Sequence, residues 1–194
     1  MSELENIKIV REKTGASMIE VKKALIDANN DIEEAAKLLR TRGQSVVDKK
    51  QDRTTAEGTI GVYLHANAKV VGIVELRCET DFVARNEDFK KLAHDLAMHI
   101  VAATPKYLSP DEIPKEIVDD ERRLVAKQFE DSGKPQNIVD KIIEGKLNTL
   151  AKEICFLTQP FIKEPDKTVQ DLITDAVAKF GEKITVGKFA RFSV

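Results

Sequence analysis

The 194-residue chain contains no tryptophan and only two cysteines, and aromatic residues make up just 5% of it. The core must therefore be built mainly from aliphatic side chains, and a phenylalanine at a position that is not expected to be buried needs an explanation. Cys78 and Cys155 are far apart and neither belongs to a CxxC motif, so neither a disulfide framework nor a zinc site is supported. We expect two buried thiols.

The chain also lacks an excess of either charge, because 31 Lys and Arg residues face 33 Asp and Glu residues, for a net charge of −2. No overall field would draw such a protein onto nucleic acid or an anionic membrane. No apolar run reaches the roughly 18 residues of a membrane span, and the N-terminus lacks the layout of a signal peptide. We expect a soluble, cytoplasmic protein that binds neither nucleic acid nor membranes directly.

The common motifs of phosphate-binding loops, zinc proteases and nucleophile elbows are all absent. His94 and His99 are five residues apart, which is not the i, i+4 spacing of helical metal ligands. The carboxylates lie mainly on expected solvated helix faces, and no catalytic pair can be picked out. The residues thus predict neither a metal nor a cofactor, and an enzyme remains a hypothesis without a positive feature.

Helical signals fill the first 43 residues, which contain no proline. Gly15 is a natural helix stop, Ser17 and Glu20 form a capping box, and Gly43 follows a basic last turn. We predict a bundle of three short helices, over residues 3–14, 17–28 and 31–42.

Residues 44–56 are polar and charged, which favours a hinge or a short solvated helix. Asp48 and Asp52 interrupt the basic residues and no aromatic is interleaved, which disfavours a nucleic-acid-binding arm. We place a domain boundary here, between a domain of residues 1–52 and a core of residues 53–194.

The core alternates strand and helix signals, which indicates an α+β fold with a small antiparallel sheet. A hairpin turn is expected at 66–68, and the last strand should pair with this hairpin. Residues 136–157 read as one helix interrupted near Gly145, or as two short helices. The predicted strands cover 59–65, 69–78 and 184–194, and the predicted helices cover 86–103, a region from 109 to 133, 136–157 and 168–180.

Phe82 and Val83 are two adjacent apolar residues between the second strand and its helix. If Asn86 caps that helix, they lie on a surface connection, where leaving each exposed forgoes about 1.5–3 kcal/mol of transfer free energy. If Thr80 or Asp81 is the cap, Phe82 falls seven residues before Phe89 on a buried stripe. Periodicity alone favours the buried alternative, whereas an exposed loop would suit docking into a partner.

Several segments resemble translation elongation factor Ts, the family of guanine-nucleotide exchange factors for elongation factor Tu. Ser17 and Ile19 depart from the residues more usual in that family, Gly or Ala and Met respectively. The likeness covers nearly the whole chain. The segments that carry it are VREKTGASMIEVKKAL (10–25), CETDFVARNEDF (78–89), SGKPQNIVDKIIEGKL (132–147), QPFIKEPDKTV (159–169) and FARFSV (189–194).

The resemblance implies an N-terminal three-helix module of the ubiquitin-associated type, followed by a single core that is commonly homodimeric. It implies a non-enzymatic exchange factor for elongation factor Tu, with no cofactor. It also reverses the preference for a buried Phe82, because in the family this segment enters the nucleotide-binding domain of the partner. The residues that it assigns to partner binding are Thr80, Asp81, Phe82 and Val83 in this segment, Arg11, Met18 and Ile19 in the N-terminal module, and His65 in the hairpin.

Two roles remain open for Asp81, which could disturb the magnesium site of the partner or merely cap its own turn. A second function also remains open, since residues 1–43 alone would suit a ubiquitin-associated-like, peptide-binding adaptor. Dimerisation is expected for a further reason: the short core, closed by the terminal strand 184–194, leaves a sheet edge to cover.

Overall fold

A computed structural model describes residues 3–50, 52–130 and 133–194. Part of the polar and charged stretch 44–56 lies outside this description, namely residue 51 and the side chains of 44–46, 48 and 49. The same holds for the first residue of the segment 132–147. Within the described ranges, no helix combines the length and the apolarity that a membrane span requires.

Three helices form the N-terminal bundle: α1 (Glu3–Thr14), α2 (Met18–Asp27) and α3 (Ile32–Lys49). Gly15 ends α1 with a positive φ of 67°, as its position predicts. The capping box is confirmed, because the Ser17 side chain accepts from the backbone N–H of Glu20 and the Glu20 carboxylate accepts from that of Ser17. The bundle has its own aliphatic core around Val10, Val21 and Leu25.

Helix α3 does not stop at Gly43, so the prediction of a helix end there is wrong. Gly43 is buried, and a Cβ atom on it would lie 3.3 Å from Cγ2 of Thr174 in α8 (Val169–Phe180). The glycine therefore allows two helices to approach closely instead of ending one. Val47 packs against the core, so the stretch 44–56 begins as the last turns of a docked helix.

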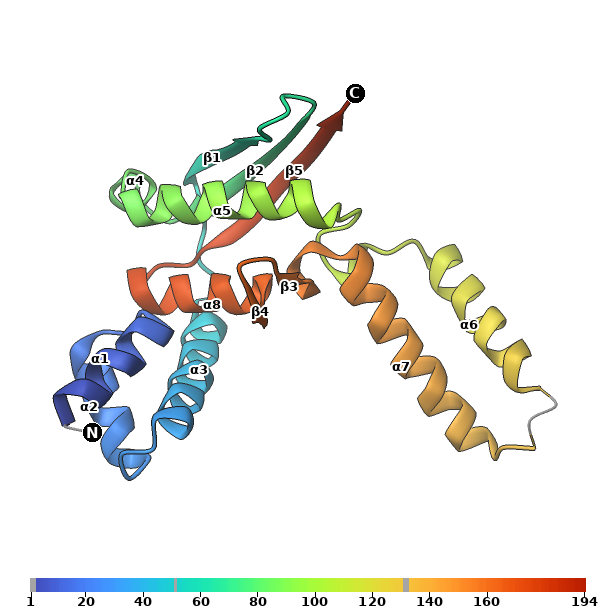
Figure 1. Ribbon diagram of the computed structural model, residues 1–194, viewed down its shortest axis with the longest axis horizontal. Coiled ribbons are helices and arrows are strands. Elements are labelled where there is room, and N and C mark those ends of the chain that lie inside the picture. Colours follow the sequence, from blue (N-terminus) through green and yellow to red (C-terminus); the bar gives the residue numbers. More distant parts are fainter. Residues whose placement is uncertain (1–2, 51, 131–132) are drawn as a thin grey trace.

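The core contains a three-stranded antiparallel sheet in the order β1–β2–β5, formed by β1 (Glu57–Leu64), β2 (Val70–Cys78) and β5 (Thr185–Ser193). The expected pairing of the last strand with the hairpin is confirmed. Helix α5 (Glu87–Ala103) covers one face of this sheet, and α8 lies between α5 and the N-terminal bundle (Figure 1).

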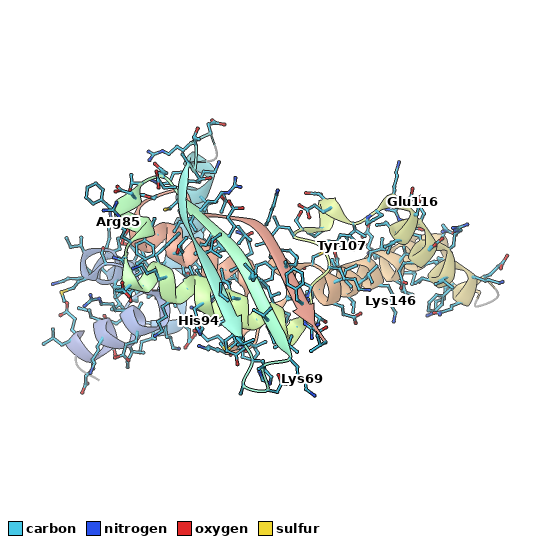
Figure 2. The ribbon with its side chains drawn as sticks, turned by 90° about the horizontal axis from the view of Figure 1, so that it is seen from above. Lys69, Arg85, His94, Tyr107, Glu116 and Lys146 are labelled. Atoms are coloured by element: carbon cyan, nitrogen blue, oxygen red, sulfur yellow. The ribbon has the colours of Figure 1, made fainter. Side chains whose placement is uncertain are left out.

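Between α5 and α8 the chain forms a helical hairpin that projects from the core (Figures 1 and 2). Helix α7 runs without interruption through Gly145, so the expected break there is wrong; a Cβ atom on Gly145 would meet nothing within 4 Å. The small sheet β3–β4 has no counterpart in the prediction. The elements of this region are η1 (Pro110–Glu112), α6 (Lys115–Phe129), α7 (Gln136–Ile154), η2 (Phe156–Thr158), β3 (Pro160–Phe161) and β4 (Glu164–Thr168).

The buried apolar side chains divide into two clusters. One lies inside the bundle and ends with Leu39, whereas the other fills the space between the sheet, α5 and α8. The division supports an α+β molecule with a helical N-terminal unit. The domain boundary after residue 52 and the ubiquitin-associated type of the bundle remain predictions.

Candidate partner-binding site

The connection between β2 and α5 forms one short helical turn, α4 (Asp81–Ala84), from which Phe82 projects. The Phe82 side chain is 84% exposed, while Ala84 is buried and Val83 packs against the core. A new helix starts at Asn86, whose side chain accepts from the N–H of Asp88 at 2.9 Å. That break separates Phe82 from the buried stripe of Phe89, so the buried alternative is wrong. The exposed alternative is confirmed for Phe82 but not for Val83, which packs against the core.

The Asp81 carboxylate lies 3.1 Å from the Arg85 guanidinium; the Arg85 side chain is largely exposed and that of Asp81 partly exposed. No hydrogen bond from a side chain caps α4, although Thr80 occupies the N-cap position. An exposed ion pair of this kind contributes about 0–1 kcal/mol. Asp81 can therefore leave Arg85 at little cost when a partner approaches.

Two apolar residues at the start of α2 are also exposed, Met18 by 57% and Ile19 by 82%. Arg11 lies on the last turn of α1, just before them, and its side chain is exposed as well. In both overall views the bundle and α4 lie toward the same end of the molecule, and the hairpin α6–α7 extends toward the other (Figures 1 and 2). The bundle residues and Phe82 could thus meet one partner together.

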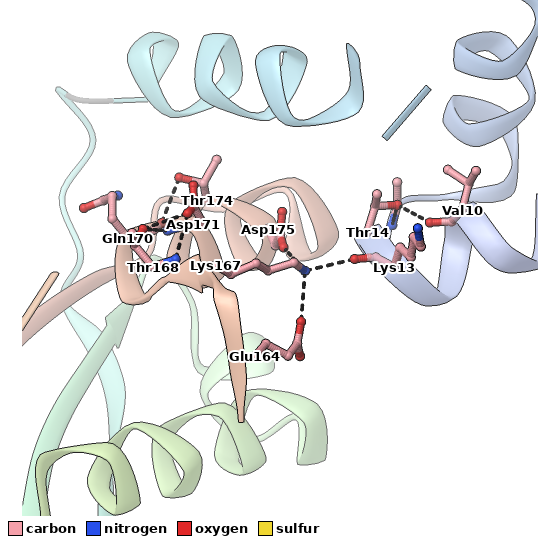
Figure 3. A network of polar contacts seen from close by, with 11 residues as sticks. Val10, Lys13, Thr14, Glu164, Lys167, Thr168, Gln170, Asp171, Thr174 and Asp175 are labelled. Carbon is pink, nitrogen blue, oxygen red and sulfur yellow. Dashed lines mark hydrogen bonds and ion pairs between the residues drawn. The ribbon is translucent and has the colours of Figure 1, made fainter. Parts of the chain in front are cut away.

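Polar contacts hold the bundle against the core next to α8, and α8 against α5. Lys167, which is largely buried, donates to the backbone carbonyl of Lys13 and to the carboxylate of Asp175, both at 2.9 Å (Figure 3). Toward the C-terminal end of α8, Lys179 forms an ion pair with Asp88 at the start of α5. The turn that carries Arg11 is therefore attached to the core by a defined network.

His65 lies at the end of the hairpin remote from α4. It follows β1 directly, whereas α4 follows the opposite end of β2, so eight residues of strand, roughly 25 Å, separate the two. Nδ1 of His65 lies 3.4 Å from the Tyr63 hydroxyl, and His65 is exposed. The structure does not bring His65 together with Phe82, so any contact of His65 with a partner would be a separate one.

The other candidate reactive groups are the two cysteines and the side chains that could ligate a metal ion. Cys78 and Cys155 are buried free thiols, as expected, and burial raises the pKa of Cys78 to about 11. In the part of the chain that the structure describes, no three His, Cys, Asp or Glu side chains are grouped so as to hold a metal ion.

Sequence reasoning missed two residues that support this site, Glu182 and Lys167. The Glu182 carboxylate accepts hydrogen bonds from the backbone N–H groups of Glu79 and Thr80, across a separation of about a hundred residues. Helix caps and hydrophobic periodicity are local signals, so neither could have indicated contacts of such long range.

Comparisons of the sequence with known proteins point to one family. The family described as Elongation factor TS matches residues 4–194. The chain is 48% identical to elongation factor Ts from Acetivibrio thermocellus over 188 residues, which cover 97% of this chain and 87% of the relative. It is 47% identical to the protein of the same name from Herpetosiphon aurantiacus over 191 residues, which cover 98% and 96% of the two chains.

The structure thus combines an α+β core that carries an exposed apolar turn with a helical N-terminal unit. Given the match over nearly its whole length, the chain belongs to the elongation factor Ts family of translation elongation factors.

Proposed function

We propose that the protein is a guanine-nucleotide exchange factor that binds elongation factor Tu·GDP in the cytoplasm and promotes GDP release, without being an enzyme in the usual sense. The observation that carries the proposal is the 84% exposure of Phe82 on a turn that is otherwise anchored in the core. A large aromatic side chain gains most when it is buried in a partner's pocket, which is why such residues dominate protein interfaces.

The energetics favour contacts with the partner at two separate places. A nucleotide held with nanomolar affinity represents about 12 kcal/mol of binding free energy, whereas coupling between sites is typically about 1–3 kcal/mol. A single contact cannot release such a ligand. We infer that Arg11, Met18 and Ile19 anchor the partner, so that the binding energy they supply lets the α4 turn distort the nucleotide site.

Within α4 the residues have different roles in this mechanism. Phe82 inserts as an apolar wedge, and Asp81 exchanges Arg85 for polar groups near the magnesium and phosphate site of the partner. Thr80 and Val83 flank the wedge and shape its approach, and His65 makes a further, independent contact. Because coupling is reciprocal, a returning nucleotide weakens the grip of the factor by the same free energy, and the factor is released.

The test is the release of fluorescent GDP from elongation factor Tu in a stopped-flow instrument. Phe82→Ala should slow the stimulated release about 10- to 100-fold, the size of a lost interface hot spot. Its free energy of unfolding should change by less than about 0.5 kcal/mol, because the side chain is exposed. Leu124→Ala, at an exposed leucine of α6, is the matched control and should retain the wild-type rate. No acceleration by the wild-type protein would refute the proposal.

The alternative function is a ubiquitin-associated-like adaptor that binds peptides through the bundle alone. The exposed Met18 and Ile19 are the observation in its favour. An adaptor would bind elongation factor Tu equally well after Phe82→Ala and less well after Ile19→Ala. An exchange factor with two contact sets requires both variants to reduce the rate of nucleotide release.

We further propose a homodimer that covers the open face of the sheet. Ile60, Val62 and Leu64 on β1 and Phe192 on β5 are exposed on the face opposite α5, and Val71 pairs with both Leu64 and Phe192. Such an apolar face is unusual on a monomer, and a second copy would bury it in a sheet-on-sheet interface.

Light scattering tests the dimer directly. The wild-type protein should show twice the 21.7 kDa mass of one chain, and Val62→Glu should reduce it to the monomer mass. Ile26→Glu places the same charge on an exposed isoleucine of α2 and should leave the dimer intact. A monomer mass for the wild type would rule the dimer out.

A further inference from the structure

Two glutamates join the turn before α4 to the turn after α8. Oε2 of Glu182 accepts from the backbone N–H groups of Glu79 at 3.0 Å and Thr80 at 3.1 Å, and Oε1 accepts from the Thr80 hydroxyl at 2.5 Å. In return, Oε1 of Glu79 accepts from the backbone N–H of Lys183 at 2.6 Å. We name this reciprocal arrangement of Glu79 and Glu182 the glutamate clasp.

Helix α4 has too few residues to be stable by itself. Four residues make barely one turn, and helices much shorter than 12 residues are unstable in water without tertiary contacts. The Thr80 hydroxyl does not cap α4, since it donates to Glu182 instead. Contacts with the rest of the protein must therefore fix the conformation of this turn.

These tertiary contacts involve the residues before and after Phe82 in the sequence. After it, Val83 and Ala84 pack into the core. Before it, the glutamate clasp holds the backbone at Glu79 and Thr80. With both sides fixed, the exposed Phe82 has little backbone freedom even though its own side chain touches solvent. Fixing one residue's backbone costs about 1–2 kcal/mol, so a turn that is ordered in advance leaves more free energy for distorting the nucleotide site once the bundle has bound.

We propose that Glu182 is a positioning residue for nucleotide exchange: it orders the α4 turn before the partner arrives, so that Phe82 is presented in its inserting orientation. This inference rests on the proposed exchange function. Glu182 itself touches neither Phe82 nor Asp81 through any hydrogen bond or ion pair described here, so it acts through Thr80 and the backbone.

The linker from the bundle joins the same clasp. The Arg53 guanidinium lies 3.1 Å from the Glu79 carboxylate, and the Lys183 ammonium donates to the Arg53 carbonyl at 2.9 Å. Hydrogen bonds from Lys183 and Arg53 hold the pKa of Glu79 below its usual range, so Glu79 is an anion at neutral pH. The clasp thereby ties the chain leaving α3 to the turn that carries Phe82.

Two substitutions at Glu182 separate hydrogen bonding from charge. Glu182→Gln retains an oxygen that can accept from both backbone N–H groups, and its NH₂ group can donate to the Thr80 hydroxyl oxygen. Glu182→Met has a similar length but accepts no strong hydrogen bond. Glu116→Met, at an exposed glutamate of α6 labelled in Figure 2, is the matched control.

The first measurement needs no partner. Hydrogen exchange of the amides of residues 79–85 should accelerate about tenfold in Glu182→Met, compared with the wild type, Glu182→Gln and the control. Amides in α5 should be unchanged. Equal protection in Glu182→Met and the wild type would overturn the inference, whatever the function of the protein.

The second measurement is the stimulated release of fluorescent GDP from elongation factor Tu as the factor is titrated. For Glu182→Met we expect a maximum rate about tenfold lower with less than a threefold change in the half-saturating concentration, and near wild-type values for Glu182→Gln. A merely destabilised factor would instead contain less folded protein, which shifts half-saturation and leaves the maximum rate unchanged.

A double variant completes the test. If Glu182 acts through the orientation of Phe82, Glu182→Met with Phe82→Ala should lose less than the product of the two separate losses. Additive losses, or a wild-type maximum rate for Glu182→Met, would overturn the inference. So would failure of both Glu182→Met and the smaller Glu182→Ala to fold. An inactive wild type would instead refute the exchange function and leave the hydrogen-exchange result standing.

Discussion

His99 lies between the rings of Phe156 and Phe161, whose centroids are 5.7 and 5.8 Å from its own. The N–H of Ile162 donates to its Nδ1, so Nε2 carries the proton and donates to Oε1 of Gln159 at 3.0 Å. Burial lowers the pKa of His99 below its usual value of 6.5, because the charged imidazolium is poorly solvated there. His99 is therefore neutral in the folded protein at neutral pH.

This pKa shift makes stability depend on pH. Below about pH 6.5 the unfolded chain binds a proton at His99 that the folded chain does not, so the free energy of unfolding should fall as the pH falls. The slope from this group stays below the limit of about 1.4 kcal/mol per pH unit that a difference of one whole proton would give. The free energy of unfolding, measured by urea denaturation between pH 7 and pH 5, should depend less steeply on pH in His99→Gln than in the wild type. Identical slopes for variant and wild type would contradict the prediction.

Phe82 and Phe89 show what the sequence predicts at the scale of single residues. Both are apolar and seven residues apart, which is the spacing of one helix face, yet one is exposed and the other fully buried. The alternative in which Asn86 caps a new helix accounted for this difference, and the family resemblance was what favoured that alternative. Periodicity did not account for it, because it assumes one continuous helix. The capping alternative thus agrees with the structure, but capping chemistry alone did not decide between the two.

At the scale of elements, glycines on the strands bring α5 close to the sheet. A Cβ atom on Gly61 would lie 2.1 Å from the backbone carbonyl oxygen of Ala93, and one on Gly72 would lie 2.3 Å from that of Ala97. Both oxygens belong to the backbone of α5, which cannot move aside as the end of a flexible side chain could. The two glycines therefore set the distance between helix and sheet.

Substitutions at Gly61 and Gly145 should have opposite effects. Gly61→Ala should destabilise the protein by about 3 kcal/mol or prevent folding, since α5 must move away from the sheet. Gly145→Ala, in the open middle of α7, should stabilise it by about 0.5–1 kcal/mol, because alanine favours the helix. Urea denaturation of the two variants measures both effects. A loss of stability in Gly145→Ala would show that α7 needs the glycine.

Most helices and strands could be predicted because their signals are local, as at Ser17, Asn86 and Thr168. The continuation of α3 past Gly43 could not, since the reason is a contact with Thr174 far away in the chain. The strands β3 and β4 are too short for a periodic pattern. The type of each element could thus be predicted where caps and periodicity were strong. The prediction failed where long-range packing decided the length or position of an element.

At the scale of the whole molecule, α8 connects the two proposed sets of partner contacts. Lys167 and Asp175 attach the bundle to it, and Glu182, just past its end, holds the α4 turn. The arrangement fixes the spacing between Met18 and Phe82 within one protein. The spacing itself could not be predicted from the sequence, since each contact joins segments far apart along the chain.

Lys167→Met should loosen the bundle without unfolding the core. It leaves the Asp175 carboxylate and the Lys13 carbonyl without this cation, at a cost of about 1–3 kcal/mol. Hydrogen exchange should therefore accelerate in α1 and α2 more than in α5. Lys37→Met, at an exposed lysine of α3, is the control and should leave all three unchanged. Equal acceleration in α1 and α5 would mean that Lys167 stabilises the molecule as a whole.

The projecting hairpin of α6 and α7 has a hydrodynamic consequence. A protein with such an arm experiences more friction than a sphere of the same mass, so it diffuses slowly and leaves a sizing column early. Elution volume compared with spherical standards would thus overstate the mass of the single chain and could mimic a dimer. Shortening the arm should increase the diffusion coefficient of monomer and dimer alike, without changing the number of chains in the particle.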